Sequence, residues 1–324
     1  MITEDQKNVI VAAQAAITTG STNSENFVEL GMAYFDAEHF DEAMTAFQQA
    51  AELDAHAADA FNWIGRVYYH LGPAEKAIEA YEHVIALDPH TIAPYYGLGI
   101  LYSAQLGNYQ AALEAFQLGL KHNAGEPFLT ASLGSTYARM GRFEKAIAAL
   151  QQAIDLDPDL AFAFGWLSII YLYQKRYDEV IASCQREIAI AESHNPRRLL
   201  GYVYTLMDEH EQAIAQLERA VAFEAQDYEA RGALSKAYRT VGRQQDADEQ
   251  YTIAGEMAGQ DNEYGQACFE AVTGNLEQAL VLLGVALTRG QVQPGWARID
   301  PEFASLTDDP QFKAFVRGSI HTKI

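Results

Sequence analysis

Residues 84–102 read VIALDPHTIAPYYGLGILY, and residues 153–171 read AIDLDPDLAFAFGWLSIIY. Each stretch contains the end of a helical pattern, an Asp-Pro pair, and an apolar run that carries a small residue and closes on Tyr. Because proline cannot continue a helix, each Asp-Pro pair indicates a helix end, and each following run indicates a new helix. The second stretch begins 69 residues after the first, so the same structural part occurs more than once in the chain.

The underlying pattern, an apolar residue followed by x-x-Leu-Gly-x-x-Tyr, recurs about every 34 residues. The small residue of each first helix is Gly31, Gly65, Gly99, Gly134, Ser168, Gly201 or Ser235. The aromatic residue three places later is Tyr34, Tyr68, Tyr102, Tyr137, Tyr171, Tyr204 or Tyr238. The second helices carry Ala43, Ala77, Ala112, Ala146, Ala213 and Ala247.

This spacing has a physical reason. Two short helices that cross closely need a residue without bulk at the crossing, and large residues beside it to fill the remaining gap. The period and the signature resemble the tetratricopeptide repeat (TPR), over roughly residues 24–293. The resemblance implies an all-α fold, a right-handed α-solenoid of stacked helix-turn-helix repeats.

We expect eight repeats, the last of them degenerate around Ala267, Gly274, Ala279 and Ala286. An amphipathic capping helix in residues 1–23 precedes the repeats, and capping helices in residues 294–324 follow them. The expected bounds of the repeats are 24–57, 58–91, 92–126, 127–160, 161–193, 194–227, 228–259 and 260–293.

The segment after the repeats, WARIDPEFASLTDDPQFKAFVRG from residue 296, resembles the C-terminal ends of many bacterial TPR proteins. Asp300-Pro301 and Asp309-Pro310 each place an N-cap acid before a proline at the first helical position, so two short helices are expected. The alternative for the Asp308-Asp309 pair is a cation site. The apolar side chains expected to cover the last repeat are Trp296, Phe303, Leu306, Phe312 and Phe315.

Two repeats depart from the pattern. The third has an extra residue before Gly107, and the fifth has Val180 and Glu187 where small residues are usual. The register of these two repeats is therefore less securely predicted.

Charge and composition exclude several classes of protein. The net charge of -22 argues against binding nucleic acid, whose phosphates require a basic surface. The sequence has no window of 18 apolar residues, so no membrane insertion is predicted. Glu4 and Asp5 lie where a secretory signal would be basic. Cys184 and Cys268 fall in apolar helical runs and are interpreted as buried free thiols of a cytoplasmic protein, with a disulfide as the alternative.

The sequence contains no recognisable catalytic motif. A phosphate-binding glycine loop ending in Lys-Ser or Lys-Thr, a His-Glu-x-x-His motif and paired Cys-x-x-Cys motifs are all missing. Half of a dinucleotide-binding fingerprint occurs at residues 96–99, but within a helix. Residues 208–211 could ligate a metal, but they lie in the turn between paired helices. We therefore predict no catalytic residues, no metal and no cofactor.

The TPR resemblance implies a concave groove lined by the face of the first helices that points away from the helix partners. We assign residues to this face from the rotation of 100° per residue in an α-helix. The face is unusually rich in aromatic residues, which is typical of binding surfaces. For the two tryptophans at its margin, packing against the neighbouring repeat is the alternative. The predicted groove residues are Phe35, Trp63, Arg66, Tyr69, Tyr96, Ile100, Arg139, Phe162, Trp166, Ile169, Tyr173, Arg198, Tyr202, Lys236 and Arg239.

Charge along the same face is uneven. The first two repeats contribute the acids Glu25, Glu29, Asp36 and Asp59, whereas the sixth and seventh contribute the cations Arg198, Lys236 and Arg239. We therefore expect a partner segment with apolar or aromatic anchors over repeats two to five, and acidic residues or a free carboxylate over repeats six and seven.

These observations predict a non-catalytic cytoplasmic adaptor or assembly scaffold. Its concave groove would bind an extended or helical segment of another protein. One alternative is a structural scaffold that assembles with copies of itself as a homo-oligomer, and another is a peptide-sensing regulator.

Overall fold

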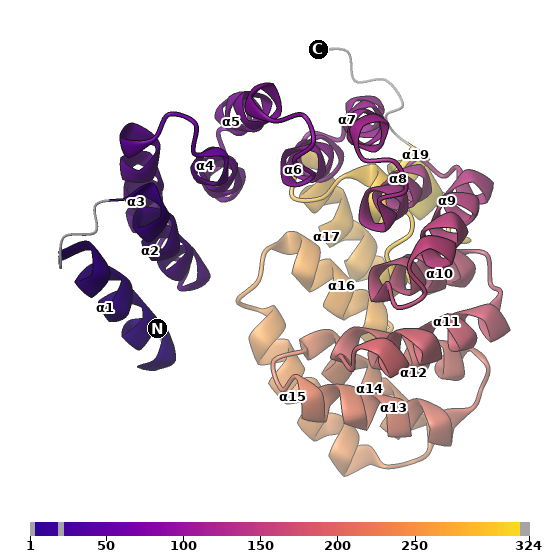
Figure 1. Cartoon of the computed structure of the whole chain (residues 1–324). Coiled ribbons are helices and arrows are strands. Elements are labelled where there is room, and N and C mark those ends of the chain that lie inside the picture. The colour runs from indigo at the N-terminus through magenta and orange to yellow at the C-terminus, as the bar shows by residue number, and fades with distance from the viewer. Residues whose placement is uncertain (1–3, 19–22, 318–324) are drawn as a thin grey trace. The chain divides into compact units, whose positions relative to one another are not determined.

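The structure, a computed structural model, describes residues 4–18 and 23–317, and every regular element in these residues is a helix (Figure 1). The chain divides into two compact bodies, residues 1–132 and residues 133–324, here called the N-terminal body and the C-terminal body. The all-α prediction is confirmed. The predicted bounds of the repeats and caps remain a prediction. Residues 1–3, 19–22 and 318–324, which belong to the predicted caps, lie outside the described residues.

Most helices form antiparallel neighbours in chain order. The helices of the N-terminal body are α1 (Glu4–Thr18), α2 (Ser24–Asp36), α3 (Phe40–Leu53), α4 (Ala58–Leu71), α5 (Ala74–Leu87), α6 (Ala93–Ile100), the π-helix η1 (Leu101–Gln105) and α7 (Tyr109–His122). The boundary between the bodies falls within α8 (Pro127–Arg139). The helices of the C-terminal body are α9 (Phe143–Leu156), α10 (Ala161–Tyr173), α11 (Tyr177–Ile190), α12 (His194–Leu206), α13 (His210–Phe223), α14 (Tyr228–Thr240), α15 (Gln244–Ala258), α16 (Glu263–Thr273), α17 (Leu276–Thr288), α18 (Pro294–Ala297), the 3₁₀-helix η2 (Pro301–Leu306) and α19 (Pro310–Arg317).

Small residues stand where paired helices cross, as the sequence predicts. A side-chain carbon at Gly65 would lie 2.6 Å from Cε1 of Tyr81, and one at Gly134 would lie 2.7 Å from Cγ of Leu150. These distances are shorter than two carbon atoms can approach, so the crossing requires glycine there. The predicted second-helix alanines all have no exposed surface: Ala43, Ala77, Ala112, Ala146, Ala213 and Ala247.

The extra residue of the third repeat is accommodated by the π-helix η1. The backbone N–H of Leu106 donates to the carbonyl of Leu101 at 3.1 Å, a hydrogen bond that spans five residues. A π-turn holds one residue more than an α-turn, so the insertion widens the helix locally and the following helix stays in register.

The predicted helix ends are confirmed. Asp88 and Asp157 follow the last residues of α5 and α9, and their Oδ1 atoms accept the backbone N–H of His90 at 2.9 Å and of Asp159 at 3.0 Å. The turn at Asp208 has a φ of 59°, in the left-handed region. His210 and Glu211 begin α13, so only the first part of residues 208–211 lies in the turn. No group of three or more His, Cys, Asp and Glu in the described residues could hold a metal ion.

The N-terminal helix α1 covers the first repeat. Ile10 and Ala13 are buried in one cluster with Leu30 and Ala33 of α2, and Ile17 lies at its edge. This is the apolar face that the sequence of the first helix predicts.

The C-terminal segment packs on the last helix pair. Phe303 and Phe312 are fully buried in one cluster with Leu283 and Ala286 of α17. Asp300 caps η2, and Asp309 caps α19 by accepting the N–H of Gln311 at 2.7 Å and of Phe312 at 2.9 Å.

Asp308 forms ion pairs with Lys175 at 2.6 Å and Lys313 at 3.5 Å. Asp308 thus forms ion pairs with two lysines, and Asp309 caps α19.

Cys184 and Cys268 are both buried and unbonded, so the prediction of buried free thiols is confirmed. Burial raises the pKa of Cys184 to about 12. None of the helices described here is long and apolar enough to cross a membrane.

Candidate binding groove

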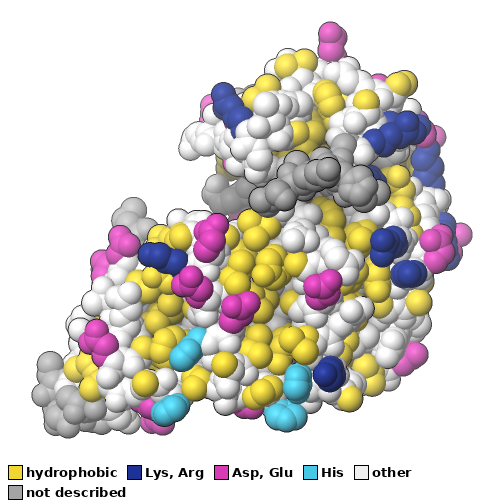
Figure 2. Space-filling view, turned by 90° about the horizontal axis from the view of Figure 1, so that it is seen from above, with side chains coloured by type: hydrophobic (Ala, Val, Ile, Leu, Met, Phe, Trp, Pro, Cys, Tyr) yellow, Lys and Arg dark blue, Asp and Glu magenta, His cyan; other side chains and the backbone are white. Residues whose placement is uncertain are grey.

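The structure divides the predicted groove residues between two places. In the N-terminal body, several line an open pocket between α4 and α6. In the C-terminal body, several lie under the chain's own C-terminal segment. On the face seen in Figure 2, apolar side chains form broad patches between scattered acidic, basic and histidine side chains.

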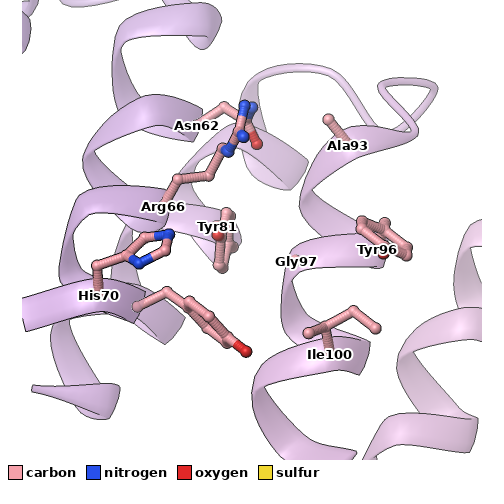
Figure 3. Close-up of a pocket in the computed structure, with 9 residues that line it drawn as sticks. Asn62, Arg66, His70, Tyr81, Ala93, Tyr96, Gly97 and Ile100 are labelled. Carbon is pink, nitrogen blue, oxygen red and sulfur yellow. The ribbon is translucent and has the colours of Figure 1, made fainter. Parts of the chain in front are cut away.

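The pocket of the N-terminal body, here called the α4–α6 pocket, has a volume of about 380 Å³. Arg66 and His70 lie on one side, Tyr96 and Ile100 lie on the other, and Tyr81 lies between them (Figure 3). The lining residues are Asn62, Arg66, Tyr69, His70, Tyr81, Ala93, Tyr96, Gly97 and Ile100. The sequence predicted four of them: Arg66, Tyr69, Tyr96 and Ile100.

Arg66 is held in place by aromatic rings. Its guanidinium carbon lies 3.9 Å from the ring centroid of Trp63 and 5.0 Å from that of Phe35. Trp63 in turn stacks on Phe47 at 5.6 Å. Phe35 and Trp63 therefore pack against Arg66 and are not among the residues that line the pocket. For Trp63 this corresponds to the alternative of packing against a neighbouring repeat. Among the described side chains, no carboxylate forms an ion pair with Arg66.

Tyr81 contributes a hydroxyl that sequence reasoning missed, because Tyr81 belongs to a second helix. Its side chain is 2% exposed, and its hydroxyl has no hydrogen-bond partner among the described residues. Burial raises the pKa of this phenol. A side-chain carbon at Gly97 would lie 2.8 Å from the hydroxyl oxygen, so the missing side chain of Gly97 leaves that oxygen open to the pocket.

The remaining walls are positioned by neighbouring elements. Gln105, in the π-helix η1, donates from Nε2 to the carbonyl of Tyr69 at 2.6 Å and thereby satisfies a carbonyl near the end of α4. The ring of Tyr96 packs on Phe128 at 4.9 Å, and burial raises the pKa of Tyr96. The π-helix η1 thus also anchors one wall of the pocket through Gln105.

In the C-terminal body, the chain's own C-terminal segment contributes to the surface formed by the predicted groove residues. A cavity of about 360 Å³ is lined by predicted residues and also by the chain's own Trp296, Pro301 and Glu302. Pro301 and Glu302 belong to η2, which contacts both α10 and α16, and Trp296 belongs to α18. The predicted residues that line this cavity are Phe162, Trp166, Ile169, Arg198 and Tyr202.

Trp296 enters the aromatic part of this surface. Its ring lies 5.8 Å from that of Trp166, which is only 8% exposed, and the Arg139 guanidinium lies 4.9 Å from the Trp296 ring and 5.2 Å from the Trp166 ring. Trp166 thus packs against the chain's own segment, and Arg139 is engaged with both tryptophans.

Arg198 is paired inside the chain. Its guanidinium donates to Asp227 at 2.9 Å and to Glu229 at 3.3 Å, and it lies 3.1 Å from Glu302. Tyr202 donates a long hydrogen bond of 3.5 Å to Glu302. The carboxylate that was expected from a partner is therefore supplied by Glu302. Burial raises the pKa of Glu229 to about 7; Arg198 opposes this rise, and the neighbouring carboxylates of Glu302 and Asp227 add to it.

The other predicted cations do not face one open segment, which corrects the expectation for repeats six and seven. Lys236 lines a small cavity with Tyr202 and Glu302, and burial lowers its pKa. Arg239 lies over the Tyr251 ring at 5.0 Å and 3.6 Å from Asp248 of α15.

Tyr173 is not among the residues that line the cavities described above. Its ring packs on Phe143 at 4.7 Å.

Glu187, which interrupts the pattern of the fifth repeat, borders the cavity of the C-terminal body. Its carboxylate lies against Gly165, and burial raises its pKa to about 7. A side-chain carbon at Gly165 would lie 3.3 Å from the carboxylate oxygens, so the missing side chain of Gly165 leaves room for Glu187.

Comparison with known families agrees with this architecture. A family model described as "Cilia and flagella-associated protein 70 C-terminal domain" matches residues 54–271, more than half of the chain, and a TPR repeat model matches residues 31–72. Neither description is restricted to bacterial proteins. No curated protein matches the sequence.

Three solved structures are similar in fold. A TPR protein from Parabacteroides merdae has a TM-score of 0.55 and 16% identity, covering 79% of this chain and 98% of that one. The type IV pilus biogenesis factor PilW has a TM-score of 0.53 and 16% identity, covering 61% of this chain and 92% of that one. The APC/C hetero-tetramer Cut9-Hcn1 has a TM-score of 0.59 and 21% identity, covering 72% of this chain and 46% of that one. At these identities the likeness establishes the TPR fold alone.

Proposed function

The chain belongs to the family of the cilia and flagella-associated protein 70 C-terminal domain, a TPR family, and on this premise we propose that it is a non-catalytic adaptor. TPR domains typically mediate protein–protein interaction. We assign the binding of a partner segment to the α4–α6 pocket and the first-helix faces beside it.

The observation that carries this proposal is the difference between the two bodies in what surrounds the groove arginine. In the C-terminal body, Arg198 is paired with Asp227, Glu229 and Glu302, and Trp296, Pro301 and Glu302 form part of the cavity wall. The α4–α6 pocket presents a comparable volume, tyrosine walls and an arginine without a carboxylate partner among the described side chains. Large aromatic side chains with a polar end are typical of sites that bind protein segments.

The proposed compartment is the cytoplasm, as the sequence indicates. The two buried free thiols, Cys184 and Cys268, support a reducing environment, in which unpaired cysteines persist.

The test is affinity capture from native cells with matched variants of the full chain. We expect Tyr69→Ala with Tyr96→Ala to lose partner proteins that the wild type retains. The control is Leu118→Ala with Leu156→Ala, which removes two exposed leucines of second helices and should leave capture unchanged.

Two results would oppose the proposal. Equal capture by the wild type and the tyrosine variant would place the partner on another surface. A molar mass that rises with concentration in light scattering, with the chain itself as the captured species, would favour the self-assembling scaffold.

A further inference from the structure

The α4–α6 pocket differs in charge from the rest of the molecule. The chain has 44 acidic residues against 22 Lys and Arg, but none of the nine residues that line this pocket is acidic. We propose that the pocket binds a carboxylate of the partner segment, and that an apolar or aromatic side chain next to that carboxylate lies against Tyr69, Tyr96 and Ile100. This inference rests on the proposed function and specifies its ligand.

The first step concerns Arg66. The guanidinium carbon lies over the Trp63 and Phe35 rings, which accept no N–H hydrogen bond in the plane of the guanidinium. The guanidinium donates to no described residue, so its N–H groups are able to donate to a carboxylate. The rings also restrict the arginine side chain before binding, which lowers the entropy lost when a ligand is bound.

The second step concerns Tyr81. The ring of Tyr81 is buried, but its hydroxyl reaches the pocket and forms no hydrogen bond with the described residues. Its oxygen borders the pocket because Gly97 has no side chain (Figure 3). A ligand oxygen in the pocket would accept the hydroxyl proton and so satisfy this group.

The third step concerns Asn62. Its Oδ1 is buried and accepts no hydrogen bond from the described residues. A carboxylate offers no proton to this oxygen, but the backbone N–H of the same partner segment does. The polar groups of the pocket therefore suit a peptide that carries an acid better than a free anion.

The charge favours a carboxylate over a phosphate. Arg66 contributes one positive charge to the pocket, which matches the single negative charge of a carboxylate. A phosphorylated side chain carries about −1.5 to −2 at pH 7 and is usually held by several cations. A cationic side chain would be repelled by Arg66.

The C-terminal body contains an internal example of part of this combination. Glu302 lies 3.1 Å from Arg198, and the next residue, Phe303, is fully buried. Phe303 packs on α17 and not beside Arg198, so the internal example covers only the carboxylate, which the chain places beside a groove arginine.

The experiment selects peptides on the full-length protein from two displayed libraries of random 12-residue segments. In one library the segment is internal, and in the other it ends in a free C-terminus. We expect enrichment of Asp or Glu within two residues of an aromatic or aliphatic residue. Enrichment in both libraries assigns a side-chain carboxylate, whereas enrichment in the second library alone assigns the C-terminal carboxylate.

The best peptide is then titrated against variants. Arg66→Gln should weaken binding tenfold or more, and replacing the acid of the peptide by its amide should weaken it equally. Combining the two changes should add little, because both remove one contact. Tyr81→Phe should weaken binding several-fold. Arg186→Gln removes an exposed arginine of the C-terminal body and is the control for net charge.

The outcomes separate the two proposals. Peptides that need Tyr69 and Tyr96 but show no acidic preference, or that bind Arg66→Gln as tightly as the wild type, overturn the carboxylate and leave the proposed function intact. Tighter binding of a phosphoserine peptide than of its Glu counterpart also overturns the carboxylate. No enrichment, or binding insensitive to both tyrosine and Arg66 variants, overturns both.

Discussion

Arg66 in the N-terminal body and Arg198 in the C-terminal body were predicted from the same helical pattern, but their surroundings differ. Arg66 lies on two aromatic rings with no carboxylate among the described side chains, whereas Arg198 is surrounded by Asp227, Glu229 and Glu302. The position of a residue on a repeat face therefore does not determine whether that face is available. Availability depends on whether a distant segment of the same chain covers it.

The largest effect should follow from loosening the covering segment. Phe303→Ala with Phe312→Ala removes two fully buried rings, and each truncation should cost about 3–5 kcal/mol. Chemical unfolding of the full chain should show destabilisation of the C-terminal body, and light scattering should show self-association through the exposed apolar surface.

The control for this change is Phe223→Ala, because Phe223 is 54% exposed and should contribute little. A double variant that stays as stable and monodisperse as the wild type would mean that the C-terminal segment does not hold the C-terminal body together.

The second prediction compares the two arginines directly. Arg198→Ala leaves three carboxylates without their shared cation and should cost about 3–5 kcal/mol, since removing one partner of a buried ion pair strands the other. Arg66→Ala should cost only about 0.5–1 kcal/mol, the contribution of an exposed cation–π contact. Urea unfolding of both variants measures the difference, and equal losses would contradict the distinction between a structural and a free arginine.

Much of the fold could be predicted from the sequence, because each repeat specifies its own helices. The glycines at the crossings, the Asp-Pro helix ends and the caps at Asp300 and Asp309 all follow from local spacing and elementary sterics. The π-helix at Leu101–Gln105 was not predicted: the sequence indicated only an extra residue in the third repeat, without its structural effect.

The candidate site was predicted less completely. Tyr81 was missed because its exposure to the pocket depends on Gly97 of the next repeat, although a second glycine two places before Gly99 was a usable signal. The ion pair of Arg198 with Glu302 depends on the packing of η2 against α10 and α16. These contacts join segments that are far apart in the sequence. Repeat spacing carries no information on them.

The third prediction concerns pH and the excess of carboxylates in the C-terminal body. Burial raises the pKa of Glu187 to about 7, above the usual 4.5, so the native protein keeps a proton that the unfolded chain has lost. Stability should therefore fall as pH rises from about 4.5 to about 7, by up to about 1.4 kcal/mol per pH unit for one such group, and then level off. Urea unfolding at pH 5, 6, 7 and 8 measures this slope.

Glu187→Gln should reduce the slope and stabilise the protein at pH 8 relative to the wild type. Glu114→Gln, an exposed position of α7, is the matched control and should leave the slope unchanged. A slope that is the same in all three proteins would show that Glu187 is ionised in the native state at pH 5.

The smallest effect, and the sharpest test of the open pocket, comes from two buried tyrosines of the N-terminal body. Tyr95 donates to the carbonyl of Pro89 at 2.9 Å, whereas Tyr81 has no partner among the described residues. Tyr95→Phe should cost about 1 kcal/mol, because it removes a hydrogen bond and leaves the carbonyl unsatisfied. Tyr81→Phe should change stability by less than about 0.5 kcal/mol, because the hydroxyl it removes forms no hydrogen bond with the described residues. If thermal unfolding showed Tyr81→Phe to be as destabilising as Tyr95→Phe, the Tyr81 hydroxyl would already be satisfied without a ligand, and it could not contribute to binding a carboxylate.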